Sequence, residues 1–193
     1  MKTEAELKDR SGNKCELCES TGQLKVYEVP PVAANEADKE IYICETCLDQ
    51  IEKRQELDSK HWQCLTTSMW SEIPAVQVVA WRMLNRFRQE SWAADNLEMM
   101  YLDEELMEFA KATGDHTGDG SVELHKDSNG NILSAGDTVT LIKDLDVKGS
   151  SLNAKIGTAV RNIRLDPNNV EYIEGKVDGQ MIVILTKYVK KQG

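Results

Sequence analysis

The stretch Cys15-Glu-Leu-Cys18, followed after 25 residues by Cys44-Glu-Thr-Cys47, decides the fold of the first part of this chain. Two residues separate the cysteines of each pair, so one tight turn can direct both sulfurs at the same ion. Four thiolates at about 2.3 Å complete the coordination of tetrahedral Zn²⁺ and leave no position for water. The spacing therefore predicts one structural zinc ion held by Cys15, Cys18, Cys44 and Cys47.

Two other interpretations of these cysteines stay open. The four thiols could form a reduced, buried cluster without a metal, or one pair could be a redox pair of the thioredoxin kind. The redox interpretation is weaker, because Cys15–Cys18 follows no buried parallel strand and a duplicated pair is typical of a metal site. The fifth cysteine, Cys64, follows His61 by three residues. These two could be a ligand pair, but packing of Cys64 against Trp62 and Leu65 is favoured.

Short elements are predicted around the cysteine pairs. Thr3 can cap a first helix, the alternation of Leu24–Val29 predicts a strand, and Ile41–Ile43 predicts a second. The pattern after Cys44 predicts a helix, and the arrangement resembles a treble clef or zinc ribbon. The opening also resembles HNH-type nucleases. Those enzymes carry histidines on the hairpin, but Lys25–Pro30 contains none, so we expect no nuclease activity.

The central part of the chain has a helical pattern. Apolar residues between Val76 and Phe87 recur at the spacing of one buried helix face, after Pro74 in the first turn. Two shorter helices follow, for which Ser91 and Asp103 are the predicted caps. Residues 114–121 are polar and glycine-rich, which is typical of a linker.

From Val122 onward the pattern is that of short strands separated by turns. About five strands in ~65 residues is the size of a small closed β-barrel. The predicted strands include Thr138–Ile142, Gly157–Ile163, Glu171–Val177 and Gln180–Val189. Turns or bulges are predicted at Gly136, Gly149, Gly157 and Gly175. We therefore expect an α+β chain with a zinc module (1–68), a helical segment packing on it (69–113), a linker (114–121) and a β-barrel domain (122–193).

The net charge of −10 comes mainly from residues 89–123, which carry ten acidic side chains and one basic one. A globally basic nucleic-acid binder is excluded. The acidic segment suits a basic partner, although its apolar residues are expected in the core. No apolar run approaches the ~20 residues of a membrane-spanning helix. The first ten residues lack the apolar stretch of a secretory signal, so we expect a cytoplasmic protein with reduced thiols.

Residues of the C-terminal part carry a family resemblance. Ala135–Val139 and Asp137–Ser151 look like the signature of the PhnA family, and Gly157–Arg164, Ile173–Gly179 and Leu185–Lys190 extend the match. The cysteine pairs resemble the zinc-binding region of that family. The helical segment between these pairs and the C-terminal part makes the chain look like an extended member of the family. The resemblance implies an SH3-like β-barrel joined to a zinc ribbon, with no established reaction. It implies a link to phosphonate metabolism by family name only.

The basic turn near the middle of the β-domain is a candidate anion site. Backbone amides and charge there could bind phosphate or phosphonate through Lys148, Ser150, Ser151 and Arg161. The favoured alternative is that these residues form a solvated face, whose charges keep the sheet edges of separate molecules from pairing.

The sequence offers no credible catalytic constellation for phosphonate cleavage. A dimetal hydrolase needs several oxygen and nitrogen ligands around open metal positions, whereas the chain has three scattered histidines: His61, His116 and His125. We therefore expect a non-enzymatic, zinc-stabilised binding or accessory protein whose partner is a protein or a small anion. Two other functions are less favoured: a nucleic-acid-associated regulator and, least favoured, an enzyme acting on phosphonates.

Overall fold

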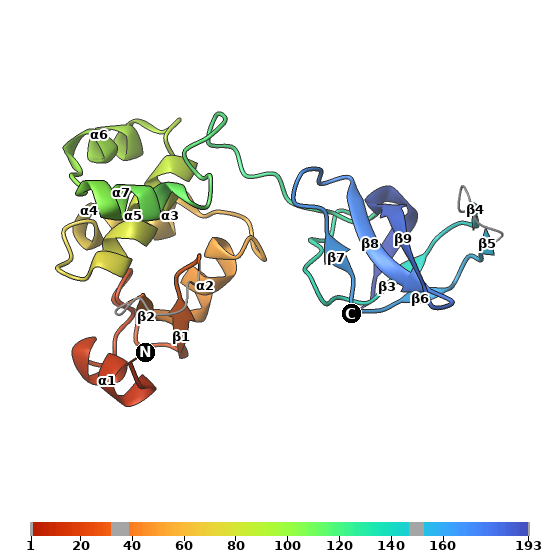
Figure 1. Cartoon of the computed structure of the whole chain (residues 1–193), viewed down its shortest axis with the longest axis horizontal. Coiled ribbons are helices and arrows are strands. Elements are labelled where there is room, and N and C mark those ends of the chain that lie inside the picture. The colour runs from red at the N-terminus through yellow and green to blue at the C-terminus, as the bar shows by residue number, and fades with distance from the viewer. Residues whose placement is uncertain (1, 32–38, 147–152, 193) are drawn as a thin grey trace. The chain divides into compact units, whose positions relative to one another are not determined.

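The computed structural model describes residues 2–31, 39–146 and 153–192. The chain forms two compact units: Met1–Glu52 with Leu57–Val122, and Lys53–Glu56 with Glu123–Gly193. Each unit has its own hydrophobic core. Figure 1 shows that helices dominate the first unit and strands the second. None of the described helices is both long and apolar enough to cross a membrane.

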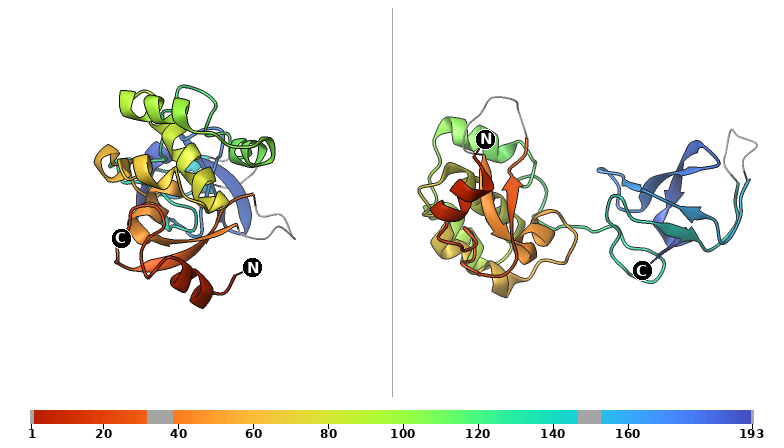
Figure 2. Two further views of the ribbon diagram at one scale, coloured as in Figure 1. Left: turned by 90° about the vertical axis from the view of Figure 1, so that its left-hand side faces the viewer. Right: turned by 90° about the horizontal axis from the view of Figure 1, so that it is seen from below.

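The first unit is built on an antiparallel hairpin of β1 (Leu24–Glu28) and β2 (Glu40–Cys44). Every residue of β2 is buried, because α1 (Glu4–Arg10) and α5 (Pro74–Arg86) both pack against this strand (Figures 1 and 2). Helix α1 begins with the predicted cap, in which Thr3 and Glu6 exchange hydrogen bonds. Both strands and this helix are therefore confirmed.

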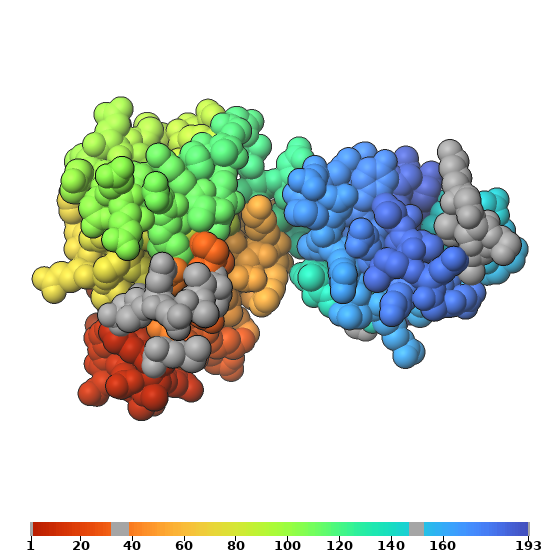
Figure 3. Space-filling model, viewed as in Figure 1, coloured from red at the N-terminus to blue at the C-terminus, as the bar shows by residue number. Residues whose placement is uncertain are grey.

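Helix α5 is the centre of the first unit. Ten of its 13 residues are buried, whereas the sequence predicted a single buried face. The difference arises because helices contact it from several sides, and a helix covered in this way is buried nearly all round. In Figure 3 the yellow-to-green helices pack directly on the red-to-orange part of the unit. The other helices are α2 (Glu45–Ile51), α3 (Ser59–Trp62), α4 (Leu65–Ser68), α6 (Ser91–Met99) and α7 (Glu104–Lys111).

Two arginines of α5 bind the open ends of neighbouring helices. Buried Arg82 donates to the carbonyls of Ala110 at 3.0 Å and Phe109 at 2.5 Å, near the end of α7. Arg86 donates to the carbonyls of the last two residues of α2, at 2.9 and 3.2 Å, and pairs with Asp115 at 2.7 Å. Since the last carbonyls of a helix lack partners within it, these contacts fasten α2 and α7 to α5.

The predicted helix boundaries and linker differ in detail from the structure. Asp103 caps α7 as predicted, accepting a hydrogen bond from Leu106 N at 2.8 Å. Ser91 is instead the first residue of α6, and Glu90 occupies the cap position. The glycine-rich stretch 114–121 is bound to the end of α5, because Arg88 donates to three backbone carbonyls between Asp115 and Gly118.

The strands of the second unit form three separate antiparallel sheets. The first has the order β10 (Val189–Lys191), β3 (Val139–Leu141), β6 (Ala159–Val160), and the second has the order β7 (Arg164–Leu165), β8 (Tyr172–Val177), β9 (Gln180–Leu185). The third is the hairpin of β4 (Leu145–Asp146) and β5 (Asn153–Ala154). Among the described residues these sheets are open, so they do not form the closed barrel predicted from the sequence. Most of the strands have only two or three residues, too few to link the sheets continuously.

The prediction of one strand over Gln180–Val189 is wrong. Strand β9 ends at Leu185, and a single 3₁₀ turn, Thr186–Tyr188, follows it. Thr186 N donates to Glu171 O at 2.8 Å, and β10 then pairs with β3 in the other sheet. Apolar residues stand on both sides of the turn, at Ile184, Leu185 and Val189, so the pattern alone does not reveal it.

Gly175 allows the two three-stranded sheets to pack closely. It lies inside β8, paired with Ile182, and not at the predicted turn or bulge. A Cβ atom at this position would overlap Cγ1 of Val160 in β6. Glycine is therefore required here by the close approach of a neighbouring side chain, not by a special backbone conformation.

We predict that Gly175→Ala lowers the free energy of unfolding of the second unit by about 1–3 kcal/mol, the usual cost of overpacking a core. Hydrogen exchange of residues 172–185 in the whole chain measures this loss. Gly22→Ala is the matched control, since a Cβ there meets only Ser20 Oγ at 3.4 Å. Adding Val160→Ala should recover part of the loss. A Gly175→Ala variant with wild-type exchange would contradict this account.

Candidate metal centre

The four cysteines of the two pairs come together in the first unit. Their sulfurs lie within 4.8 Å of one another. Cys15 and Cys47 are 3.8 Å apart at Sγ, and Cys18 and Cys44 are 3.6 Å apart. Zinc–sulfur bonds of about 2.3 Å in a tetrahedron place sulfurs about 3.8 Å apart, whereas a disulfide needs about 2.05 Å. The spacing fits a tetrahedral metal ion and not a pair of disulfides.

The first pair lies in a tight turn just before β1. Cys15 N donates to Ser20 O, and Glu19 N donates to Cys15 O, both at 2.8 Å. Glu19 has a left-handed backbone with φ of 59°, which reverses the chain after Cys18. The turn therefore directs both sulfurs to one side.

The glutamate between the first two cysteines fastens this turn to the hairpin. The side chain of Glu16 is only 4% exposed and accepts two hydrogen bonds from Arg10, each 2.7 Å long. It also accepts one from Tyr42 N at 2.7 Å, and Glu16 N donates to Tyr42 O. Because β2 also carries Cys44, these bonds set the distance between the two cysteine pairs.

The second pair spans the junction of β2 and α2. Cys44 occupies the cap position of the helix, and its sulfur accepts the N–H of Cys47 at 3.5 Å. The N-terminal end of a helix favours negative charge. The junction thus supplies two sulfurs in an environment that stabilises thiolates, and the helix predicted after Cys44 is confirmed.

Hydrogen bonds among the four thiols shift their pKa values in opposite directions. A hydrogen bond with Cys18 lowers the pKa of Cys15 to about 7, and one with Cys15 lowers the pKa of Cys44. The contacts with Cys15 raise the pKa values of Cys18 and Cys47. Four thiols at this distance cannot all carry negative charge unaided. A divalent cation supplies the positive charge that allows all four to ionise.

His61 and Cys64 take separate places beside the cluster. His61 Nε2 lies 3.1 Å from Cys47 Sγ, so the histidine contacts a cysteine of the cluster and not Cys64. Cys64 is half-buried against the core of the first unit, outside the four-sulfur group. Burial raises the pKa of Cys64 to about 12, and the negative charge of Cys15 adds to this effect. The sequence contained no signal for the contact between His61 and Cys47.

The candidate anion site is only partly within the described residues. Lys148, Ser150 and Ser151 lie outside them, and Arg161 is exposed after β6. Of the other basic residues nearby in sequence, Lys143 stacks on Tyr188, and Lys155 pairs with Asp144 at 3.3 Å. The anion site therefore stays a prediction.

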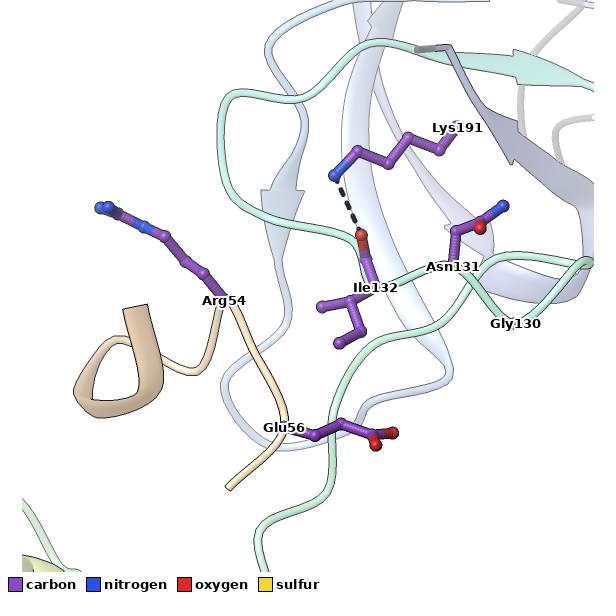
Figure 4. Close-up of a pocket in the computed structure, with 6 residues that line it drawn as sticks. All are labelled: Arg54, Glu56, Gly130, Asn131, Ile132 and Lys191. Atoms are coloured by element: carbon purple, nitrogen blue, oxygen red, sulfur yellow. Dashed lines mark hydrogen bonds between the residues drawn. The ribbon is translucent and has the colours of Figure 1, made fainter. Parts of the chain in front are cut away.

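The second unit contains a hollow of about 650 Å³ (Figure 4). In Figure 4 the ammonium group of Lys191 points at the carbonyl oxygen of Ile132, to which it donates at 3.0 Å. The same ammonium pairs with Asp137 at 2.8 Å. These contacts give Lys191 a structural role in its own unit. The hollow is lined by Arg54, Glu56, Gly130, Asn131, Ile132 and Lys191.

Comparison with known proteins finds relatives of the C-terminal part. Residues 125–192 match the family model described as PhnA domain. Protein YjdM of Escherichia coli K12 is 52% identical over 67 residues, which are 34% of this chain and 60% of that protein. Protein YjdM of Streptococcus mutans is 48% identical over 66 residues, which are 34% of this chain and 59% of that protein.

The match covers only part of this chain and part of each relative. The chain spans about 60% of the length of the curated relatives from Escherichia coli and Streptococcus mutans. The matched family model begins at residue 125, so the cysteine cluster and the helices of the first unit lie outside it. Within these limits the resemblance noted in the sequence is confirmed: residues 125–192 of this chain match the PhnA domain family.

Proposed function

We propose that this chain is a non-enzymatic binding or accessory protein in which one structural Zn²⁺ holds the first unit together. The ion is bound by Cys15, Cys18, Cys44 and Cys47. The PhnA domain is the part that meets a partner, either a protein or a small anion. A link to phosphonate metabolism rests on the family name implied by the resemblance.

One observation carries the zinc proposal: four sulfurs meet at the spacing of a tetrahedral site. Thiolate ligands select zinc among the common divalent ions. Cys15 and Cys47 are 1% and 0% exposed, and four protein ligands leave no position for a substrate or an activated water. Such a centre supports folding and not catalysis. A reducing compartment such as the cytoplasm keeps these thiols available for the metal.

We predict that the protein, purified under reducing conditions without a chelator, contains one equivalent of zinc. Elemental analysis against protein concentration measures this ratio. The reason is that a closed four-thiolate site binds zinc tightly enough to keep it through purification. Less than half an equivalent would contradict the proposal.

We predict that Cys44→Ser abolishes zinc binding and the cooperative unfolding of the first unit, while the second unit stays folded. The two units have separate cores, and the binding energy of a structural zinc is folding energy, about 10–16 kcal/mol in small domains. All four tryptophans lie in the first unit, so their fluorescence reports on it alone. Hydrogen exchange of residues 125–192 reports on the second.

Cys64→Ser is the matched control for this experiment. Cys64 lies close to the cluster in the same core but outside the four-sulfur group. This variant should keep its zinc and its tryptophan fluorescence transition. Loss of both units together in Cys44→Ser, or a first unit that stays folded without zinc, would count against the proposal.

A further inference from the structure

A histidine outside the four-cysteine cluster contacts one of the proposed metal ligands. His61 lies on α3, 14 residues after Cys47, and its Nε2 atom is 3.1 Å from Cys47 Sγ. The side chain is half-buried. Its ring meets that of Trp62 edge-on, with centroids 5.4 Å apart. The contact therefore joins the metal centre to the helical part of the first unit.

The position of α3 is set by the same helix that carries Cys47. Gln50 lies one turn after Cys47 in α2 and is 2% exposed. Its side-chain oxygen accepts hydrogen bonds from Asp58 N at 2.8 Å and from Trp62 Nε1 at 2.7 Å. These donors lie on either side of His61. One buried amide thus holds both flanks of the segment that directs the histidine at the sulfur.

The chemistry of the centre determines the direction of this hydrogen bond. A zinc-bound thiolate has no proton, so it can only accept, and Nε2 of His61 must carry the hydrogen. Four thiolates around Zn²⁺ leave a net charge of −2, which N–H groups offset. The backbone N–H of Cys47 makes such a contact with the sulfur of Cys44 at 3.5 Å. At Cys47 a side chain makes this contact.

We propose that His61 is a positioning residue of the metal centre, whose hydrogen bond to Cys47 increases the affinity for zinc. This inference rests on the proposed zinc site. Groups that hydrogen-bond to metal ligands orient them and tune their donor strength, and their loss typically costs 10–100-fold in metal affinity. Because His61 lies on α3, the affinity for zinc also depends on how α3 packs against the cluster.

The experiment compares whole-chain variants in which the donor is removed, replaced or left intact. His61→Ala removes it, and His61→Gln keeps an N–H donor on a side chain of similar reach. His116→Ala is the matched control: His116 lies in the same unit and contacts the Trp81 ring. Competition with a chromophoric chelator measures zinc affinity. The sulfur-to-metal charge-transfer band of the Co²⁺-substituted protein measures the donor strength of the thiolates.

We expect His61→Ala to bind zinc about 10–100-fold more weakly and to shift the cobalt charge-transfer band to lower energy, because an unbonded thiolate is the stronger electron donor. His61→Gln should recover most of both properties, and His116→Ala should match the wild type. Tryptophan fluorescence checks that each variant is folded.

Three results would overturn the inference. In the first, His61→Ala binds zinc as tightly as the wild type. In the second, His61→Gln is no better than His61→Ala, which would mean that the histidine only fills space. In the third, the wild-type cobalt spectrum shows three sulfurs and one nitrogen, which would make His61 itself a ligand. A wild type that binds neither metal would instead overturn the zinc proposal, and this inference with it.

Discussion

The first unit depends on one constraint: the sulfurs of Cys15, Cys18, Cys44 and Cys47 must lie close together. It joins the turn before β1, the end of β2 and the start of α2, which are short and lie up to 32 residues apart. A hairpin of two five-residue strands is marginal alone. Here three of the four cysteines belong to the same buried core as α5. A metal ion at this point would therefore support the hairpin, the helices that pack on it and the contact with His61 together.

The two cores divide the chain into a unit that contains the cysteine cluster and a unit that contains the family match. The first unit buries three of its four clustered cysteines, Cys15, Cys44 and Cys47, and Cys18 is partly buried. The second unit carries the family match and presents exposed basic side chains such as Arg161. In its described residues the two three-stranded sheets meet where Val160 covers Gly175.

Features that depend on local sequence were predictable, and features that depend on packing were not. The spacing within each cysteine pair, the cap at Thr3 and the cap at Asp103 each involve residues within a few positions of one another. The burial of α5 on nearly all sides, the open sheets and the position of His61 depend on segments distant in sequence. Gly175 shows the same limit, because its reason for being glycine lies in another strand.

The most direct test of the central claim is the zinc K-edge X-ray absorption spectrum of the whole purified protein. The account predicts four sulfur neighbours at about 2.3 Å and no nitrogen or oxygen in the first shell. That result would be the signature of a closed, structural centre of four cysteine sulfurs. A first shell containing an oxygen or nitrogen ligand would contradict it, because an open or mixed centre is not the closed scaffold on which the account depends.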